Sequence, residues 1–306
     1  MDTAVVGSSR IMTSVVQSLG KAARRDTSVL LLGETGTGKD LAARKIHELS
    51  TRSPHSFVAI NCSNLNETFF ESELFGHTKG AFTGAFHEKV GLLEAAGCGT
   101  VFMDEIGEIP LHLQARILRL LDNKEARKIG ATETKFIRAR FIFATNKDLR
   151  ANVMNGTFRK DLYYRINVLV IRIPPLRERK EDLAELVAHF VDLENARNGT
   201  RKLMAPDAME KLRAYDFPGN IRELENIVER AFVFSEHELI RADDIHLDQD
   251  NGLQGSLPML SVLEETLWQC RWNKTQAASK FGKSRRQFYR LMDKHQLIEH
   301  GRKRPS

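Results

Sequence analysis

A glycine-rich stretch near the amino terminus has the residue types and spacing of a phosphate-binding loop. The stretch GETGTGK matches the pattern G-x-x-x-x-G-K, and its seven positions are Gly33, Glu34, Thr35, Gly36, Thr37, Gly38 and Lys39. In such a loop the backbone N–H groups surround phosphate oxygens at the start of a helix, and the lysine neutralises their charge. The apolar run VLLL precedes the loop and a helical pattern follows it, which favours a nucleotide site over a chance match.

Two adjacent acids could complete a hydrolytic site. Asp104 and Glu105 follow the apolar run TVFM. An aspartate at the end of a strand can hold Mg²⁺, and a neighbouring glutamate can orient or deprotonate an attacking water; the alternative is a solvated acidic turn. Asp40 follows the loop lysine, where Ser or Thr normally offers a hydroxyl to the metal, so we expect Mg²⁺ to depend more on Asp104 and water.

The composition indicates an ordinary folded protein with a basic end. The 306 residues are 42% hydrophobic and 28% charged, which allows roughly two or three domains. The net charge is +6, and residues 260–306 alone hold eleven Lys/Arg against four Asp/Glu. Cys62, Cys98 and Cys270 have no Cys-x-x-Cys spacing, so neither a disulfide framework nor a zinc site is predicted. No apolar run is long enough to span a membrane, and we expect a cytoplasmic protein without a membrane partner.

Alternating apolar runs and helical patterns must position these residues. The runs predict strands at 28–32, 57–60, 100–103, 141–144 and 168–173. With helical patterns between them, they predict an α/β fold with a mostly parallel sheet covered by helices on both faces. After Pro175 we expect no further strands, because the remaining periodic segments, 180–195, 206–215 and 219–235, are helical. The expected segments are a sheet subdomain at 1–173, a helical lid subdomain at 174–247, a linker at 248–258 and a basic domain at 259–306.

A second glycine-rich stretch, GHTKGAFTGAF at 76–86, has no acid, nucleophile or metal ligand at its centre. It occurs in order with GETGTGKD, FMDEIGE, FRKDLYYRINVLVIRIPPLRERKEDL and FPGNIRELEN. This set resembles the AAA+ ATPase domain of bacterial sigma-54-dependent activators, also called enhancer-binding proteins, over nearly all of residues 1–245. The resemblance implies that the chain binds and hydrolyses ATP with Mg²⁺. An acid after the loop lysine is also a trait of that family, which Asp40 shares.

The resemblance assigns sensing roles to three polar residues. Asn61, in AINCSNL, matches the asparagine that restrains the catalytic glutamate, here Glu105; a strand-end cap is the alternative. Asn146, in ATNKDL, matches the sensor of the γ-phosphate, and its alternative is a turn-forming asparagine. Arg222, in GNIRELEN, matches a second sensor that contacts the nucleotide, and its alternative is a solvated helix residue.

Two arginines resemble the family's arginine fingers. Arg159 and Arg165, in FRKDLYYR, match residues that reach the phosphates bound by a neighbouring subunit, and surface salt bridging is the alternative. Fingers acting in trans require subunits packed head to tail, and a head-to-tail interface that closes makes a ring. The resemblance implies a hexamer, built from copies of this chain or from paralogous subunits.

The hexapeptide at the centre of the second stretch is expected to contact sigma-54. Its residues are Gly80, Ala81, Phe82, Thr83, Gly84 and Ala85. The glycines free the backbone to present Phe82 and Thr83 at a loop tip, whereas the alternative is an aromatic core residue in a turn. The resemblance also places a second loop, near 129–134, beside this one.

The basic end has the pattern of a helix-turn-helix. Ser284 and Gln287 form a capping box before the last helix, and the small Ala277 and Ala278 allow close helix packing. The segment resembles a Fis-type DNA-binding domain. Its predicted DNA-binding residues are Ser284, Arg285, Arg286, Tyr289 and Arg290, with a solvated basic face as the alternative.

Together these features predict an enhancer-binding ATPase that remodels the closed promoter complex of sigma-54 RNA polymerase into an open one. The match begins almost at Met1, so we expect no built-in receiver domain and control by a regulatory antagonist protein or a co-activator subunit. The layout resembles the Hrp regulators of type III secretion. Two alternatives are a non-catalytic DNA-binding regulator and another AAA+ remodelling ATPase.

Overall fold

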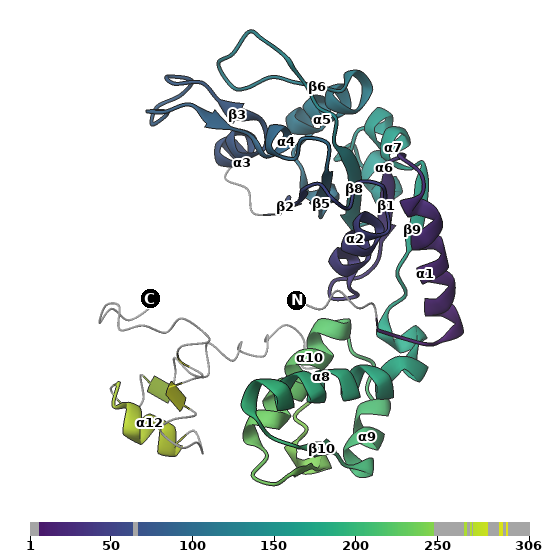
Figure 1. Cartoon of the computed structure of the whole chain (residues 1–306), viewed down its shortest axis with the longest axis vertical. Coiled ribbons are helices and arrows are strands. Elements are labelled where there is room, and N and C mark those ends of the chain that lie inside the picture. Colours follow the sequence, from purple (N-terminus) through teal and green to yellow (C-terminus); the bar gives the residue numbers. More distant parts are fainter. Residues whose placement is uncertain are drawn as a thin grey trace. The chain divides into compact units, whose positions relative to one another are not determined.

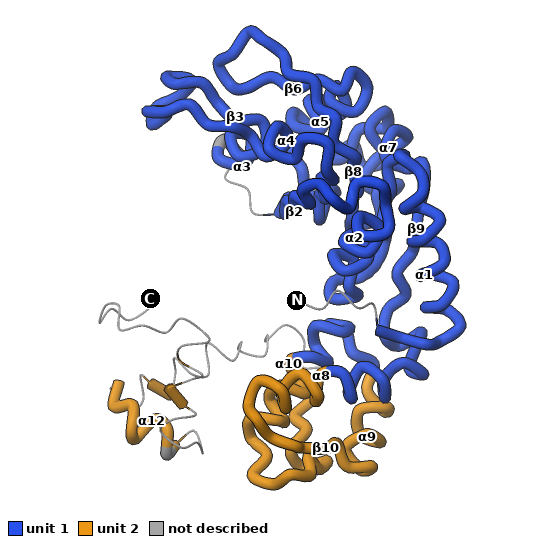
Figure 2. The backbone as a smooth tube through the Cα atoms, in the orientation of Figure 1, with its two compact units in different colours: residues 1–189, 216–225 blue, residues 190–215, 226–306 orange. Residues whose placement is uncertain are grey.

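The computed structural model describes residues 6–63 and 67–247, together with residues 266–267, 270, 272–280, 288–289 and 292 of the tail. The chain divides into two compact units, residues 1–189 with 216–225 and residues 190–215 with 226–306 (Figure 2). The phosphate loop and the two predicted acids all lie in the first unit.

Five parallel strands form the central sheet of the first unit (Figure 1). Their order is β2-β5-β8-β1-β9. Their bounds are β1 Val29–Leu32, β2 Phe57–Asn61, β5 Thr100–Asp104, β8 Arg140–Thr145 and β9 Leu169–Arg172. All four neighbouring pairs are parallel, so the carboxyl ends of the strands share one edge of the sheet, which is the usual ligand-binding edge. The five predicted strands and the parallel sheet are confirmed.

Alternate residues of the strands face two separate cores, because successive side chains of a strand point to opposite faces. Leu30 and Phe143 belong to the first core, and Leu31 and Ile142 belong to the second. Helices α1 and α2 pack on the second core, and α3 to α7 supply residues to the first. The helix bounds are α1 Arg10–Ala23, α2 Lys39–Glu48, α3 Glu67–Phe75, α4 Leu92–Ala95, α5 Leu111–Asn123, α6 Leu149–Met154 and α7 Lys160–Ile166.

Two short antiparallel hairpins extend from this unit. Strand β3 (Gly76–His77) pairs with β4 (Lys89–Val90), and β6 (Glu125–Ala126) pairs with β7 (Lys135–Phe136). The first hairpin carries the GAFTGA hexapeptide and projects from the sheet, as Figure 1 shows around β3. Short 3₁₀ turns cover Ile106–Glu108, Leu176–Glu178 and Lys180–Asp182.

The second unit is mainly helical, as predicted. It contains α9 (Pro206–Arg213) and the later parts of α8 (Leu183–Asn198) and α10 (Asn220–Phe234), followed by a 3₁₀ turn at Ala242–Asp244. The expectation of no strand after Pro175 is wrong in one detail. Strands β10 (Leu203–Met204) and β11 (Leu239–Ile240) form a parallel pair. Two residues are too few to produce an apolar alternation, so the sequence pattern carried no signal for this pair.

The described part of the basic tail contains α12 (Lys274–Lys280). The side chain of Asn273 caps this helix by accepting the N–H groups of Thr275 and Gln276, both at 3.2 Å. A small apolar cluster lies around it, and its buried members are Leu267, Ala277, Ala278, Phe288 and Met292. The two alanines predicted to allow close packing are therefore buried.

Candidate functional site

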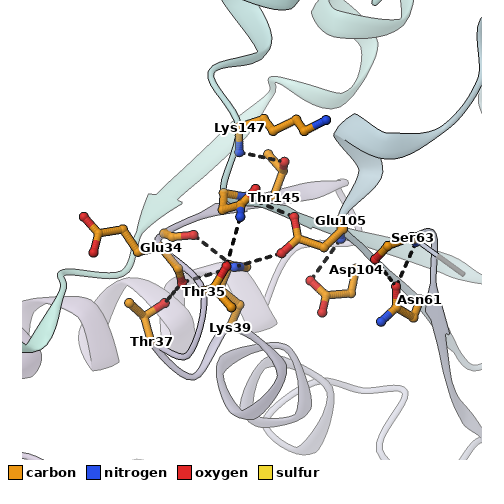
Figure 3. A network of polar contacts seen from close by, with 12 residues as sticks. Glu34, Thr35, Thr37, Lys39, Asn61, Ser63, Asp104, Glu105, Thr145 and Lys147 are labelled. Atoms are coloured by element: carbon orange, nitrogen blue, oxygen red, sulfur yellow. Dashed lines mark hydrogen bonds and ion pairs between the residues drawn. The ribbon is translucent and has the colours of Figure 1, made fainter. Parts of the chain in front are cut away.

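The phosphate loop lies between β1 and α2, at the carboxyl edge of the sheet (Figure 3). Gly36 and Gly38 have φ angles of +78° and +92°, a backbone region that residues with a Cβ rarely adopt. The Thr37 hydroxyl donates to the Glu34 carbonyl at 2.8 Å and stabilises the turn. Lys39 is 6% exposed, and its ammonium group donates to the carbonyls of Gly33 at 3.0 Å and Glu34 at 3.3 Å. Lys39 is therefore held inside the loop, where its positive charge is expected to neutralise bound phosphates.

The two predicted acids meet this lysine at the end of β5. Glu105 has a left-handed backbone (φ 53°), and its N–H donates to Asp104 Oδ1 at 3.0 Å. Glu105 Oε1 lies 3.4 Å from Lys39 Nζ. Burial raises the pKa of the Asp104 carboxyl, and the nearby Glu105 and Asp40 carboxylates raise it further. The site thus concentrates negative charge beside the loop.

Asp104 is the residue from which a ligand to a divalent cation is expected. Burial is the main cause of the raised pKa of its carboxyl, and the carboxylates of Glu105 and Asp40 add to it. Mg²⁺ is commonly held by one or two carboxylates together with substrate phosphates.

Asn146 joins the phosphate loop to Glu105, the residue predicted to act on water. It follows β8, and its backbone N–H donates to Glu105 Oε2 at 3.3 Å. Its side-chain amide donates to Thr35 Oγ1 at 2.9 Å. Asn146 therefore contacts both the phosphate loop and Glu105, which is the location that a sensor of the γ-phosphate needs.

Asn61 is engaged in a local turn. Its Oδ1 accepts the Ser63 N–H at 2.9 Å and the Ser63 hydroxyl at 2.6 Å (Figure 3). Asn61 is paired in register with Asp104, one residue from Glu105, yet Glu105 is held by Lys39 and Asn146. This geometry is that of the strand-end cap. The restraint of Glu105 by Asn61 stays a prediction.

Of the two predicted arginine fingers, Arg159 precedes α7 and Arg165 lies in its last turn, and both are at the surface. Arg159 precedes the helix and forms an ion pair with Asp161 at 2.7 Å; its side chain is 43% exposed. Arg165 pairs with Asp122 at 3.0 Å and donates to the Leu121 carbonyl at 2.8 Å; its side chain is 46% exposed. Each guanidinium is thus held by a local carboxylate at a solvent-accessible position.

The first turn of α10 and the preceding Gly219 pack directly against the phosphate loop. The Ile221 and Arg222 N–H groups reach the Gly36 carbonyl at 3.0 and 3.3 Å, while the Arg222 side chain is exposed. A Cβ on Gly36 would lie 2.2 Å from the Gly219 carbonyl oxygen, so only glycine permits this approach. The predicted second sensor therefore contacts the loop through its backbone.

Sequence reasoning missed two side chains that contact the loop, those of Asn220 and Arg177. Asn220 is fully buried with φ +57°; its amide group donates to Glu34 Oε2 at 3.2 Å and to the Thr35 carbonyl at 3.0 Å, and its Oδ1 accepts the Leu176 N–H at 2.8 Å. Arg177 donates to Glu34 Oε2 at 2.7 Å. This hydrogen bond, the main cause, and that of Asn220 lower the pKa of Glu34 to about 2. The available signal for Asn220 was its place two residues before Arg222 in the GNIRELEN motif, but its partners lie far away in the sequence.

A cavity of about 730 Å³ opens beside the phosphate loop. Its walls include Gly33, Asn146, Arg150, Tyr163 and Arg172. This volume is within the range of small-molecule sites, roughly 300–1,000 Å³. Cationic side chains in its wall suit an anionic ligand such as a nucleotide.

The hexapeptide forms a closed turn at the end of its hairpin. The Gly80 N–H donates to the Ala85 carbonyl at 2.8 Å, and the Ala85 N–H donates to the Phe82 carbonyl at 3.0 Å. Phe82 is partly buried, with its ring edge-on to His77 at a centroid distance of 5.0 Å. It lies outside both cores of the first unit, so the alternative of a core aromatic does not describe its environment.

The second predicted loop lies beside the base of this hairpin. The Thr78 N–H donates to the Ile129 carbonyl at 3.0 Å, and the Ile129 N–H donates to the Gly76 carbonyl at 2.9 Å. His77 and Ile129 form a parallel bridge. The structure therefore joins the start of the 129–134 loop to β3 through the backbone.

Most of the predicted DNA-contacting residues lie outside the described residues: Ser284, Arg285, Arg286 and Arg290. Tyr289 is described, and Lys274 Nζ lies 5.4 Å from the centroid of its ring.

Among the residues that the structure describes, no helix is long and apolar enough to cross a membrane.

Three family models match successive parts of the chain. Residues 5–172 match the sigma-54 interaction domain, residues 177–256 the AAA+ ATPase lid domain, and residues 261–295 the bacterial regulatory protein, Fis family. These matches agree with the parallel sheet, the helical second unit and α12.

The chain is also similar to two regulatory proteins. The chain is 40% identical to the response regulator protein PilR of Pseudomonas aeruginosa, over 95% of this chain and 69% of the relative. It is 41% identical to the Nif-specific regulatory protein of Azotobacter vinelandii, over 94% of this chain and 58% of the relative. This chain therefore spans little more than half the length of the latter.

A crystal structure of NtrX from Brucella abortus in complex with ADP has a similar fold. Its TM-score is 0.75 with 29% identity, and the alignment covers 96% of this chain and 69% of that one. A second NtrX structure, in complex with ATP, has a TM-score of 0.73 and 30% identity, over 95% of this chain and 68% of that one. The chain therefore belongs to the family of sigma-54-dependent transcriptional regulators, with an AAA+ ATPase domain, its helical lid and a Fis-type helix-turn-helix.

Proposed function

We propose that this chain is a DNA-tethered ATPase that activates transcription by sigma-54 RNA polymerase. In this proposal the basic tail binds enhancer DNA, and ATP hydrolysis in the first unit changes the position of the GAFTGA hairpin. The moving hairpin remodels the closed promoter complex into an open one. The match to the sigma-54 interaction domain supports the contact with sigma-54, and the match to the Fis family supports DNA binding.

The chemistry rests on Lys39, Asp104 and Glu105. Lys39 and the loop N–H groups bind the phosphates of ATP. Mg²⁺, held by Asp104 and the phosphates, would neutralise charge on the phosphate oxygens. The oxygen of a water molecule bonds to the γ-phosphorus as the bond to the bridging oxygen breaks. Glu105 takes the proton of that water, ADP leaves with the bonding electron pair, and inorganic phosphate is released.

Arg159 and Arg165 would act on the nucleotide bound by the neighbouring subunit. Each forms an ion pair with one surface carboxylate, and Arg165 also donates to the Leu121 carbonyl; exposed ion pairs of this kind contribute little to stability. Arg159 and Arg165 can therefore leave their local partners for the stronger charge of a bound triphosphate. A head-to-tail interface that uses them closes into a ring, which we propose to be a hexamer of identical or paralogous subunits.

Asn146 would report the state of the nucleotide. It contacts Thr35 in the phosphate loop and Glu105 at the catalytic position, so a γ-phosphate between them changes both contacts together. A bistable arrangement of this kind is how hydrolysis moves a distant loop in other nucleotide switches. We propose the GAFTGA hairpin as the moving element.

The single observation that supports this function most strongly is the meeting of Lys39, Glu105 and Asn146 beside the phosphate loop. The test is binding of the purified full chain to sigma-54 with ADP and aluminium fluoride, a mimic of the hydrolysis transition state. We expect a complex with the mimic and none with ADP alone. Equal binding in both states would reject nucleotide-gated activation.

Two variants separate this proposal from the alternatives. A Glu105→Ala chain that still activated a sigma-54 promoter would support the non-catalytic regulator. A Phe82→Ala chain that kept both ATPase activity and sigma-54 binding would support another AAA+ remodelling activity. Regulation by an antagonist protein, and a role in type III secretion, stay predictions.

A further inference from the structure

The hairpin carries a second phenylalanine directly after the hexapeptide. Phe86 is 75% exposed, more than any other phenylalanine or tyrosine in the described part of the chain. Burial of this apolar area beneath a partner would stabilise a complex. Phe86 is thus the aromatic side chain most available for contact on this hairpin.

Phe82, in contrast, is already partly covered by its own hairpin. Its ring lies edge-on to His77, and His77 Nδ1 is hydrogen-bonded to the hydroxyl of buried Ser72 at 2.7 Å. Because Ser72 belongs to α3, these contacts tie the Phe82 ring to the base of the hairpin. Phe82 can therefore fix the shape of the tip while it offers less free surface than Phe86.

The backbone presents Phe86 at the rim of the closed turn. The hydrogen bond from Gly80 to Ala85 closes the hexapeptide, and the Phe86 N–H donates to the Gly84 carbonyl at 2.9 Å. A Cβ built on Gly80 or Gly84 would meet no atom within 4 Å. The tip around Phe86 is therefore open, with room for another surface to approach.

The chemistry of the tip favours a protein surface over nucleic acid. Residues 80–86, GAFTGAF, carry no charge, although Lys79 precedes them. The next carboxylate, Glu88, is paired with Lys128 at 2.7 Å. The tip thus offers hydrophobic area in place of a cluster of cations for phosphates. It is also part of the segment that matches the sigma-54 interaction domain.

We propose that Phe86 is a second aromatic contact with sigma-54, which buries its ring in an apolar surface of that protein beside Thr83. In this arrangement Phe82 holds the tip in shape and Phe86 supplies much of the buried area. The inference rests on the proposed function, because it adds a contact to the same nucleotide-gated complex.

The test compares full-length variants in binding to labelled sigma-54 with ADP and aluminium fluoride, measured by fluorescence anisotropy. Phe86→Ala should weaken binding about ten-fold or more, because truncation of a buried aromatic anchor has effects of this size. Phe86→Leu should lose less, since it keeps much of the apolar area. Leu203→Ala is the matched control, because Leu203 is 66% exposed but lies in the second unit. Basal ATPase activity should stay within about two-fold of the unmodified chain for all three variants.

The outcomes separate the inference from the proposed function. If the unmodified chain fails to bind sigma-54 in a nucleotide-dependent way, the proposed function fails and this inference with it. If the unmodified chain binds and Phe86→Ala binds equally well, only the inference is overturned. A loss that appears only when promoter DNA is added assigns the ring to DNA and also overturns it. If Phe86→Ala loses ATPase activity, Phe86→Gln decides: weaker binding with normal ATPase activity supports the inference, and unchanged binding rejects it.

Discussion

The ammonium group of Lys39 and the carboxylate of Glu105 form an ion pair across the phosphate loop, with Nζ and Oε1 3.4 Å apart. Both side chains are well covered, at 6% and 16% exposed. The lysine must also meet the phosphates of ATP, so the nucleotide and Glu105 compete for one positive charge. Glu105 can act on water most freely when the lysine is drawn towards the phosphates.

This pairing predicts separate effects on binding and on chemistry at Glu105. Glu105→Gln should bind ATP at least as well as the unmodified chain, since it removes a carboxylate that competes for Lys39. Its turnover should fall by about 10²–10⁴-fold, the usual contribution of a general base. Phosphate release and fluorescent-ATP binding measure the two effects. Glu108→Gln is the control, because its carboxylate pairs with Lys147 at the surface; equal losses in both variants would contradict the assigned role.

The positions of Arg159 and Arg165 predict that two inactive variants of the chain restore each other's activity when they are mixed. Arg159→Ala leaves the phosphate loop intact but removes a finger, and Lys39→Ala disables the loop but keeps the finger. If the finger acts in trans, a mixture of the two should recover part of the ATPase activity, because some interfaces combine an intact loop with an intact finger. ATPase activity is measured as a function of the mixing ratio. Activity that never exceeds the sum of the separate chains would place the finger in its own subunit's site.

The hydrogen bonds from Asn220 to the phosphate loop predict that this residue, although outside the loop, affects the affinity for ATP. Asn220→Ala removes two donors to the loop and leaves the Leu176 N–H without its acceptor, at a cost of about 1–3 kcal/mol in unfolding free energy. Asn220→Gly is the matched control for the backbone, since φ is +57° and glycine tolerates this region. Both variants should raise the KM for ATP. Alanine should destabilise the fold by roughly 1 kcal/mol more than glycine. Thermal unfolding and ATPase kinetics measure these effects, and an unchanged KM in both variants would reject the role.

The sequence predicted the sheet and the location of the phosphate loop well because both depend on local patterns. Apolar runs marked all five strands, and the loop from Gly33 to Lys39 has a fixed spacing that a strand and a helix frame. Parallel strands bring their carboxyl ends together, so Asp104 at the end of β5 and Asn146 after β8 lie at one edge of the sheet.

The contacts that were missed join segments distant in the sequence. Glu34 meets Arg177 and Asn220, and Ser9 meets Asp182, but no periodicity links these positions. The same limit applies to the hairpin. The sequence singled out Phe82, whereas the relative exposure of Phe82 and Phe86 depends on how the turn closes against His77. Contacts between distant segments and the exposure of each ring depend on tertiary packing, which a local sequence pattern does not show.

The contact between Ser9 and Asp182 predicts a strong dependence of stability on a buried carboxylate. Asp182 is fully buried and accepts the Ser9 N–H at 2.6 Å and the Ser9 hydroxyl at 2.8 Å. Asp182→Ala should cost about 2–3 kcal/mol, because it leaves two buried donors unpaired. Ser9→Ala should cost about 1 kcal/mol, mainly through the lost cap of α1. Thermal unfolding of the single and double variants gives the coupling energy, and additive losses would show that the contact is unimportant.

The ion pair of Glu34 predicts a pH-dependent part of stability. Arg177 and Asn220 lower the pKa of Glu34 from 4.5 to about 2. A carboxyl group whose pKa is lowered by folding stabilises the protein above its unfolded pKa, and this contribution disappears as the pH falls from about 4.5 towards 2. Glu34→Gln should therefore reduce the unfolding free energy at pH 7, and the difference from the unmodified chain should shrink between pH 5 and pH 3.5. The Glu34 side chain is 43% exposed, so solvent screening limits the effect to about 1 kcal/mol or less. Denaturant titrations across this range measure it. The same substitution in an Arg177→Ala background is the control and should have a smaller effect, whereas a difference that is constant with pH would contradict the assignment.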